Sequence, residues 1–445
     1  MAFDSYFYIL LFLPVAAAGY FALQGLSWAR AWLLICGLAF YTLADLRHLP
    51  ILACSLLINY GLTRLLAPRP GDRGLLFFGI LFNLLAFLWL RWAAQPGPSL
   101  ASARFGLPLA LGVFTLQQIA LLVEAYRGRA VYGFLDHGLC VAFFPQLLAG
   151  PISLHREILP QLGRPKGLDY SSLARGLLLF SLGLFKKTML ADSFGVWARA
   201  GFTSPGELNL LEAWLACFSN TLQIYFDFSG LMDMASGSAL AFGVELPSSF
   251  DSPYQALDIR DFWRRWHKSL GRWLRAYVAR PLAGRLGKAP SVLIVFLAAS
   301  LWYGAGGTFL VWGLLNAAAF LWHRSWLGSG LRCPRPLAWL LTFLFVNASW
   351  VLYRASSLAE ASKLLRGMTL GPFPPAGVDI FQSEIPARAA WAVALGLLIC
   401  LLSSNSSRLA KEFRPSWRHA LLCFFAFLLG LLGIGQMRDH LYLEF

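Results

Sequence analysis

Charged residues are scarce in this 445-residue chain. They make up 13% of the sequence, whereas hydrophobic residues make up 58%. The acidic sign is the scarcer one, with 22 Asp and Glu residues against 37 Lys and Arg residues. A soluble domain carries about 25% charged residues. The composition therefore excludes a soluble protein and indicates an integral membrane protein.

Cysteine and histidine patterns of the kind that bind metals are also missing. The seven cysteines are scattered, and no pair has the spacing of a redox or zinc motif. The seven histidines form no metal-like cluster. We therefore predict no metal site and no bound cofactor, and we assign the cysteines to packing. Since internal repeats and low-complexity tails are absent too, we predict a single membrane domain over residues 1–445.

Long apolar stretches without charged residues recur along the whole chain. They are Ser5–Ala29, Ala31–Ala44, Leu49–Thr63, Gly74–Leu90, Phe105–Val123, Leu139–Leu154, Ala213–Phe226, Ala289–Trp322, Pro336–Tyr353, Ala389–Ser407 and Ala420–Met437. A membrane-spanning helix needs about 20 such residues, so the pattern predicts an all-α polytopic protein with about 11–13 transmembrane or re-entrant helices. The first stretch follows Asp4 rather than a basic leader, which is atypical of a cleaved signal peptide.

The formal net charge of +15 comes from loops between these stretches. Nine of the 37 basic residues lie between Arg260 and Lys288. Basic loops follow the positive-inside rule and bind lipid headgroups, so we expect this block to face the cytoplasm. We accordingly expect membrane lipids, and no nucleic acid, among the partners.

The most informative segment reads Asp-Phe-Trp-Arg-Arg-Trp-His over residues 261–267. If residues 260–277 form one helix, the aromatic side chains share an arc of about 120° and the arginines lie outside it. This pattern predicts a helix that lies flat at the membrane surface, with its cations toward phosphate or another anionic ligand. His267 falls at the edge of the apolar arc, which suits a group that handles protons.

Polar side chains within apolar stretches usually face a cavity or a partner. Two groups stand out. Gln117, Gln118 and Glu124 share one span, with Arg127 just beyond it, and Asn220, Gln223 and Asp227 share one helix face of another. They have two interpretations. One is the wall of a water-filled funnel, and the other is an internal hydrogen-bonded cluster that fixes helix packing.

Two breaks are expected at membrane depth. Pro145 and Pro151 remove backbone donors and predict a broken helix between them. The stretch 289–322 is too long for one crossing, and the run Gly304-Ala305-Gly306-Gly307 allows it to turn. Tyr303 then lies at the tip of one helix.

Together these stretches resemble the membrane-bound O-acyltransferase (MBOAT) family, in particular its bacterial branch of alginate O-acetylation and D-alanine export proteins. The resemblance covers a core of roughly residues 105–361. Its matching blocks are Leu107–Gly128, Ala142–Leu162, Gly183–Asp192, Thr221–Gly284, Leu301–Leu315 and Leu341–Ala361.

The resemblance implies a ring of helices around a thinned centre with a central tunnel, in the inner membrane of a bacterium. It implies a cytoplasmic acyl donor, acetyl-CoA or an acyl-carrier thioester. It also implies an extracytoplasmic polysaccharide as acceptor, reached through a separate periplasmic acetyltransferase. The resulting activity is an O-acyltransferase that moves an acetyl group across the membrane.

The chain departs from the family pattern at two histidines. Tyr303 stands where the family has the histidine of Leu-Trp-His-Gly, and Asn316 replaces the histidine of Trp-Gly-x-x-His-Gly, so His267 is the family histidine that remains. Imidazole suits general-base catalysis at neutral pH, whereas a phenol with a pKa of about 10 does not. We therefore expect His267 to act as the base and Tyr303 to polarise the acyl carbonyl.

Three hypotheses remain open at this point. The chain is an active acetyltransferase, a catalytically silent relative that serves as a scaffold for a polysaccharide-modifying complex, or a conduit without covalent catalysis. For the first, guanidinium groups would bind donor phosphates. The candidate donor- and substrate-binding residues are Arg264, Arg265, Arg272, Trp266, Asp227, Gln223 and Asn316.

Overall fold

A computed structural model describes residues 2–24, 28–93, 110–129, 131–148, 150–163, 167–304, 306–330, 333–373 and 387–435. Within these ranges every regular element is a helix. The first half contains α1 Leu13–Ala22, α2 Trp28–Ala44, α3 Leu49–Leu66, α4 Arg73–Ala93, α6 Leu111–Tyr126, α7 Phe134–Ala142, α8 Phe144–Leu147, α9 His155–Leu162, α10 Tyr170–Phe185 and α11 Asp192–Thr203.

The second half begins with the longest helix, α12. Its elements are α12 Leu210–Leu240, α13 Ile259–Arg265, α14 Lys268–Leu274, α15 Arg280–Leu286, α16 Lys288–Tyr303, α17 Gly307–Gly328, α18 Arg335–Arg354, α19 Leu358–Leu370, α20 Ala387–Leu402, α21 Ser406–Lys411 and α22 Trp417–Gly433. Single π-helical turns lie at η1 Tyr8–Phe12, η3 Lys186–Ala191 and η5 Arg275–Ala279, and 3₁₀ turns at η2 Leu46–His48 and η4 Pro253–Gln255.

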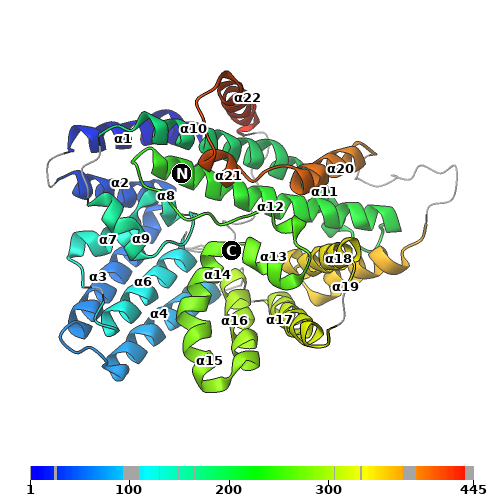
Figure 1. Ribbon diagram of the computed structural model, residues 1–445, viewed down its shortest axis with the longest axis horizontal. Coiled ribbons are helices and arrows are strands. Elements are labelled where there is room, and N and C mark those ends of the chain that lie inside the picture. The colour runs from blue at the N-terminus through cyan, green and yellow to red at the C-terminus, as the bar shows by residue number, and fades with distance from the viewer. Residues whose placement is uncertain are drawn as a thin grey trace.

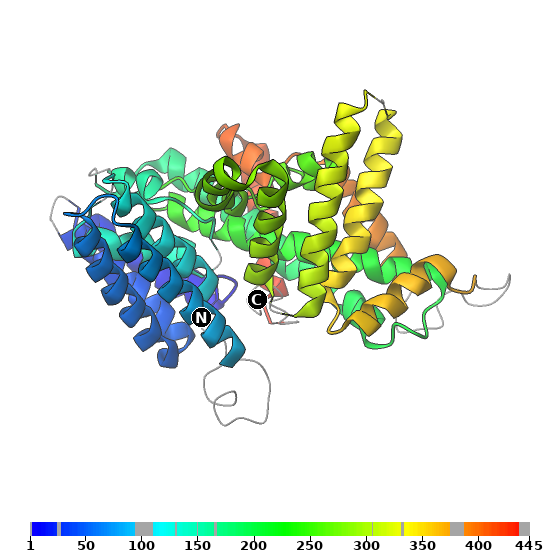
Figure 2. The same cartoon turned by 90° about the horizontal axis from the view of Figure 1, so that it is seen from below.

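Helix α12 runs through the middle of the molecule (Figure 1). Helices α10 and α11 pack along it, and α3, α4 and α6 form a separate group that is blue to cyan in the figure. Helices α17 and α18 stand side by side at the other end of the molecule (Figure 2). The short elements α13 and α14 lie between these groups, so the segment that the sequence singled out is central.

Glycines bring α10 and α12 into close contact. A Cβ added at Gly183 would lie 2.6 Å from the Gly230 carbonyl oxygen, and one added at Gly237 would lie 2.5 Å from the Gly176 carbonyl oxygen. Both helices thus repeat glycine after seven residues, which keeps the small residues on one face. Small residues permit close packing where lipid supplies little hydrophobic drive between helices.

Among the residues that the structure describes, three helices are long and apolar enough to cross a membrane by length and composition: Leu46–Leu66, Arg73–Ala93 and Arg335–Arg354. Six shorter apolar helices accompany them, among them α6 and α16. Large apolar side chains such as Phe77, Trp89 and Leu341 are exposed on these helices, as expected for surfaces that face lipid. The prediction of an all-α polytopic membrane protein is confirmed.

The prediction of one continuous helix over residues 260–277 is wrong. Helix α13 ends at Arg265, and α14 begins at Lys268 after a break at Trp266 and His267. Because the backbone changes direction there, one helical wheel does not describe both sides of the break. Residues beyond it continue through η5 into α15, which packs with η5 against α16 rather than lying flat by itself (Figure 1).

Both predicted chain breaks are present. Helix α7 ends at Ala142, and the one-turn helix α8 precedes an extended segment that leads to α9. Helices α16 and α17 are separate, with Gly304 following the first and Gly307 opening the second. The residues 105–109 of the predicted core, and Ala149 and Ala305 within the two breaks, lie outside the described residues.

Candidate active site

The imidazole of His267 and the phenol of Tyr303 meet in the interior. The distance from His267 Nδ1 to the Tyr303 hydroxyl oxygen is 2.9 Å, and each residue is only 2% exposed. The two residues come from the α13–α14 break and from the end of α16. The structure therefore brings together the two residues that the sequence analysis proposed as catalytic.

His267 adopts an unusual backbone conformation. Its φ of 39° lies in the left-handed region, which costs a non-glycine residue about 1–3 kcal/mol unless its surroundings enforce it. A neighbouring loop does so, because the Lys268 amide donates to the Ser249 carbonyl and the Asp251 amide donates to the Arg265 carbonyl. The break in the helix thus aims the imidazole at Tyr303.

Tyr303 is fixed from its backbone side by Arg91 of α4. The Arg91 guanidinium donates to the Trp302 carbonyl oxygen at 2.9 Å and to the Tyr303 carbonyl oxygen at 2.6 Å. These carbonyls belong to the last turn of α16, where acceptors lack partners within the helix and a cation is favoured. Arg91 is buried, with 8% exposure, so it caps α16 inside the protein.

Aromatic rings enclose the pair. The Phe228 ring centroid lies 4.6 Å from that of His267, and the Trp302 centroid lies 5.5 Å from it. On the other side, the rings of Trp312 and Tyr353 pack edge-on against Tyr303 at 5.6 and 5.4 Å. The enclosure is apolar, so polar interactions within it are strong.

The electrostatics of His267 follow from its burial. His267 lies between two short helices, outside the candidate spans, and burial lowers its pKa to about 3. The imidazole is therefore neutral at physiological pH and carries one proton on either Nδ1 or Nε2. Nε2 is buried without a hydrogen-bond partner in the described part of the chain, so it is available to a bound substrate.

A buried neutral imidazole that contacts a phenol and keeps one free nitrogen can move a proton to or from a hydroxyl group. The family model of membrane-bound O-acyltransferases matches residues 81–354, which include both site residues and Arg91. The chain belongs to the membrane-bound O-acyltransferase family. It is therefore an O-acyltransferase, and its predicted family membership is confirmed.

Curated relatives point to the same branch. A peptidoglycan O-acetyltransferase from Helicobacter pylori is 37% identical over 423 residues, covering 83% of this chain and 80% of that protein. The probable alginate O-acetylase AlgI of Pseudomonas aeruginosa is 31% identical over 403 residues, covering 83% and 75%. A teichoic acid D-alanyltransferase from Bacillus subtilis is 24% identical over 262 residues, covering 54% and 66%.

The three arginines proposed to bind the donor are all engaged by carboxylates. Arg264 and Arg265 both pair with Asp261 on their own helix, and Arg272 pairs with Glu157 of α9 at 2.6 Å. Arg264 is also the most exposed of the three, with 71% of its side chain accessible. Their contacts in the structure are thus intramolecular.

Asp227 and Gln223 lie in polar clusters on α12. The Lys187 ammonium, which is completely buried, lies 3.3 Å from the Asp227 carboxylate and 2.6 Å from that of Asp192. Gln223 accepts a hydrogen bond from Arg354 of α18. These contacts join α11, α12 and α18, so they favour the interpretation of a cluster that fixes helix packing.

Trp266 and Asn316 lie close to the aromatic enclosure. The Trp266 ring packs at 4.8 Å on Trp350, which in turn stacks on Trp312. Asn316 lies one helical turn beyond Trp312 and donates to its carbonyl oxygen at 2.8 Å. The Asn316 side-chain oxygen is buried without a hydrogen-bond partner among the described residues, so it remains available as an acceptor.

Sequence reasoning missed Arg91 and Lys187. Arg91 comes directly after the apolar stretch that ends at Leu90, where an arginine usually only marks the membrane boundary. Its two acceptors lie more than 200 positions further along the chain, and no local pattern indicates them. Lys187 could have been flagged as a charge beside an apolar helix. In the described residues no group of three or more His, Cys, Asp or Glu could hold a metal.

Proposed function

We propose that this enzyme takes an acetyl group from a cytoplasmic thioester and delivers it across a bacterial inner membrane for O-acetylation of an extracytoplasmic polysaccharide. The acetyl group leaves through a separate periplasmic acetyltransferase. The single observation that carries the proposal is the hydrogen bond between His267 and Tyr303 within an aromatic enclosure. The names of the relatives, which include peptidoglycan and alginate acetylating proteins, support the substrate class.

In the proposed step, the neutral His267 carries its proton on Nδ1, and this N–H donates a hydrogen bond to the Tyr303 oxygen. The Tyr303 hydroxyl is then free to donate to the carbonyl oxygen of the thioester, and Nε2 is free to accept a proton. Nε2 removes the proton of the acceptor hydroxyl, a carbon–oxygen bond forms and the carbon–sulfur bond breaks. The imidazolium returns the proton to the departing thiolate, so the products are an acetate ester and a free thiol.

A tyrosine in place of the family histidine suits this division of roles. A phenol is a poor base at neutral pH but a good hydrogen-bond donor to a developing oxyanion. The low basicity of the buried His267 is offset when negative charge develops on the nearby carbonyl oxygen. Both residues thus act together in the transition state.

The distribution of basic residues supports entry of the donor from one face. Helix α16 begins at Lys288 and ends at Tyr303, 15 residues later. At about 1.5 Å per residue, Tyr303 lies about 22 Å along the helix axis from that basic start. By the positive-inside rule, the face that carries Lys288 is cytoplasmic. A donor must therefore reach deep into the protein to meet the site.

The test is the O-acetate content of surface glycans in cells that express single variants. We expect His267→Gln to lower acetylation by about 10²–10⁴-fold, because the general base is lost. Tyr303→Phe keeps the ring contacts and removes the hydroxyl, and we expect a smaller loss of about 10-fold or more. The matched controls are Tyr170→Phe, at an exposed tyrosine, and His419→Gln, at a partly exposed histidine in the first turn of α22. Unchanged acetylation in His267→Gln cells would remove His267 from the mechanism.

A second candidate function is favoured by Tyr303 itself, which replaces the family histidine. In this alternative the chain has lost catalysis and serves as a membrane scaffold for a polysaccharide-modifying complex. The variant Tyr303→His distinguishes the two. A scaffold gains acyl transfer with the histidine restored, whereas the proposed mechanism loses its hydroxyl donor and gains nothing.

A further inference from the structure

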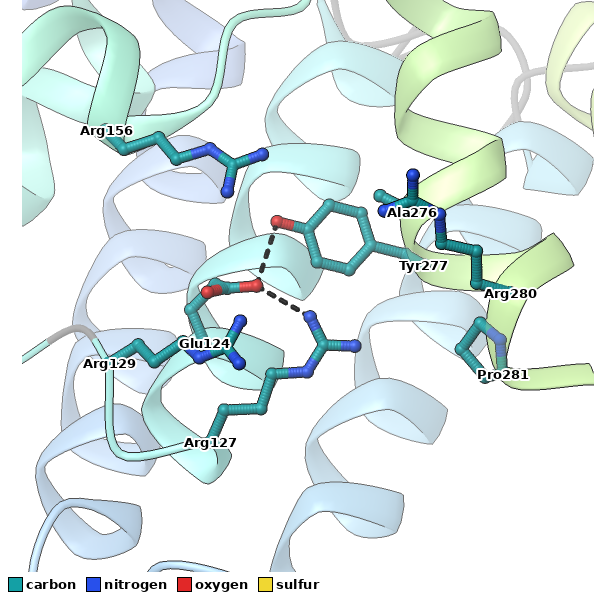
Figure 3. A pocket seen from close by; sticks show the side chains of 8 residues that line it. All are labelled: Glu124, Arg127, Arg129, Arg156, Ala276, Tyr277, Arg280 and Pro281. Carbon is teal, nitrogen blue, oxygen red and sulfur yellow. Dashed lines mark hydrogen bonds and ion pairs between the residues drawn. The ribbon is translucent and has the colours of Figure 1, made fainter. Parts of the chain in front are cut away.

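A basic pocket of about 490 Å³ opens beside α6 and η5, away from the His267–Tyr303 pair. Figure 3 shows its principal side chains, which come from three separate parts of the chain. They are Glu124, Arg127 and Arg129 at the end of α6, Arg156 at the start of α9, and Tyr277 and Arg280 on the η5–α15 wall. Four arginines against one carboxylate leave an excess of three positive charges.

The base of the pocket is held in place by hydrogen bonds. Glu124 is 5% exposed and accepts from Arg127 at 2.8 Å and from the Tyr277 hydroxyl at 3.4 Å. The Arg127 guanidinium also lies 5.8 Å from the centre of the Tyr277 ring. Burial raises the pKa of Tyr277 to about 12, so its hydroxyl stays protonated as a donor. Glu124 thus orients one arginine and the tyrosine.

The remaining three arginines have no such engagement. Arg129, Arg156 and Arg280 are exposed, and none of them makes a salt bridge within the part of the chain that the structure describes. The Arg129 and Arg156 guanidinium groups surround the Glu124–Tyr277 contact, and Arg280 lies on the opposite wall (Figure 3). This contrasts with Arg272 nearby, whose guanidinium is already held by Glu157.

We propose that this pocket binds a phosphoryl group through Arg129, Arg156 and Arg280, on the basic face of the protein. Guanidinium groups pair with phosphate oxygens through two parallel hydrogen bonds, and Arg is favoured where such recognition is needed. The volume exceeds that of a phosphate alone and falls in the usual range for small-molecule sites, so a larger phosphate ester fits. Guanidinium groups from three parts of the chain line the pocket, which suits an anion.

The pocket is linked to the reaction site by one continuous helical segment. From His267 the chain runs through α14 and η5 to Tyr277, about 15 Å at 1.5 Å per residue. Trp273 fastens this segment to α6 by donating to the Leu116 carbonyl oxygen at 2.9 Å. Two sources of the phosphoryl group fit this position: the phosphates of a coenzyme A donor, and the headgroup of an anionic phospholipid. The first of these rests on the proposed function, and the second does not.

The experiment measures binding by the full-length protein in nanodiscs. In one arm the discs contain phosphatidylcholine, and coenzyme A is titrated against pantetheine, which lacks the phosphates. In the other arm the discs contain phosphatidylglycerol, and the lipid retained by the protein is measured by native mass spectrometry. The test variant is Arg129→Gln, Arg156→Gln and Arg280→Gln combined. The matched control removes three exposed arginines elsewhere, with Arg366→Gln, Arg414→Gln and Arg418→Gln.

We expect the test variant, and not the control, to lose binding by about tenfold or more in one arm, because three charge-assisted contacts are removed. Loss in the coenzyme A arm, with no binding of pantetheine in the parent, identifies the donor as the source. Loss in the phosphatidylglycerol arm identifies the lipid. Equal binding by test and control variants in both arms overturns the proposal.

Failure of this site and failure of the proposed function give different results. Binding needs no turnover, so we expect His267→Gln to bind as the parent does even though it transfers no acetyl group. If the arginine variant binds the phosphate ester normally while the parent acetylates glycans, the proposed phosphoryl site is overturned and the proposed acetyltransferase function is kept. If the parent binds the phosphate ester but acetylates no glycan, the proposed phosphoryl site is supported and the proposed acetyltransferase function is overturned.

Discussion

The proposed chemistry depends on a single residue, a neutral imidazole whose two nitrogens have different surroundings. Nδ1 of His267 contacts the Tyr303 hydroxyl, and Nε2 is buried without a hydrogen-bond partner among the described residues. A buried polar atom left this way is costly unless a ligand satisfies it. In the proposed function, the acceptor hydroxyl of the substrate is the ligand that satisfies Nε2.

The pH dependence of the reaction follows from this burial. Because the pKa of His267 is lowered to about 3, we expect kcat/KM for acetyl transfer to stay level as the pH falls from about 7 to about 5. An unperturbed imidazole would be mostly protonated at the lower value and would show a falling acid limb. The measurement is a pH–rate profile in proteoliposomes buffered equally on both sides. A steep acid limb near pH 6.5 would contradict the neutral buried base.

The same shift fixes the sign of a stability effect. The folded imidazole stays neutral below pH 6.5, whereas the unfolded one takes up a proton there. The unfolded state therefore binds more protons, and the contribution of His267 to stability is present above about pH 6.5 and falls as the pH is lowered.

At the scale of elements, the site exists because two helices end where they do. The break between α13 and α14 aims His267, and the end of α16 presents Tyr303. The turn after Tyr303 was predictable from the glycine run, since only a flexible stretch lets a long apolar segment reverse. The break at His267 was not predictable from the sequence, because the amphipathic pattern of residues 260–277 is that of a continuous helix. The hydrogen bonds that hold the break open come from residues 249–251, which lie outside that pattern.

Arg91 gives an element-scale prediction. Its two hydrogen bonds cap the last turn of α16, so we expect Arg91→Met to loosen that turn and lower acetyl transfer by about tenfold or more. Arg91→Lys keeps the charge but not both hydrogen bonds, and we expect an intermediate rate. Activity per folded protein, measured after size-exclusion chromatography, separates this effect from expression. Parent-like activity of Arg91→Met would show that the cap is dispensable.

The close contact between α10 and α12 gives a second prediction about the packing of helices. A side chain at Gly183 would collide with the backbone of α12, so we expect Gly183→Val to lower the thermal unfolding temperature markedly or prevent folding. The matched control is Gly61→Ala in α3, where an added Cβ meets nothing within 4 Å. This control should be neutral or slightly stabilising. Similar melting temperatures for the two variants, measured in the same detergent, would refute the close packing.

At the scale of the whole molecule, the sequence predicted the class of fold and the central pair but not how the pair is held. Apolar stretches and the Asp261–His267 motif identify a membrane protein and its reactive segment, because these signals are local. Contacts such as Arg91 with Tyr303, or Lys187 with Asp227, depend on helix packing and leave no local pattern. For the same reason, the arginines of the Asp261–His267 motif looked like ligand-binding residues, although both pair with Asp261.

The distribution of basic residues over the whole molecule bears on the proposed direction of acetyl transfer. The basic ends of α15 and α16 and the basic pocket beside η5 share one region, and the proposed function places that region on the cytoplasmic side, in line with the positive-inside rule. The donor would then enter from the face where thioesters are made, and the polysaccharide would lie beyond the other face.

The most direct test of this account is release of coenzyme A thiol by purified protein in proteoliposomes that are supplied with acetyl-CoA on the basic face. Parent protein is compared with His267→Gln, and His419→Gln serves as the control. We predict acceptor-dependent thiol release by the parent and the control, with a loss of about 10²-fold or more in His267→Gln. Equal release by the parent and His267→Gln would contradict the claim that the His267–Tyr303 pair carries out the transfer.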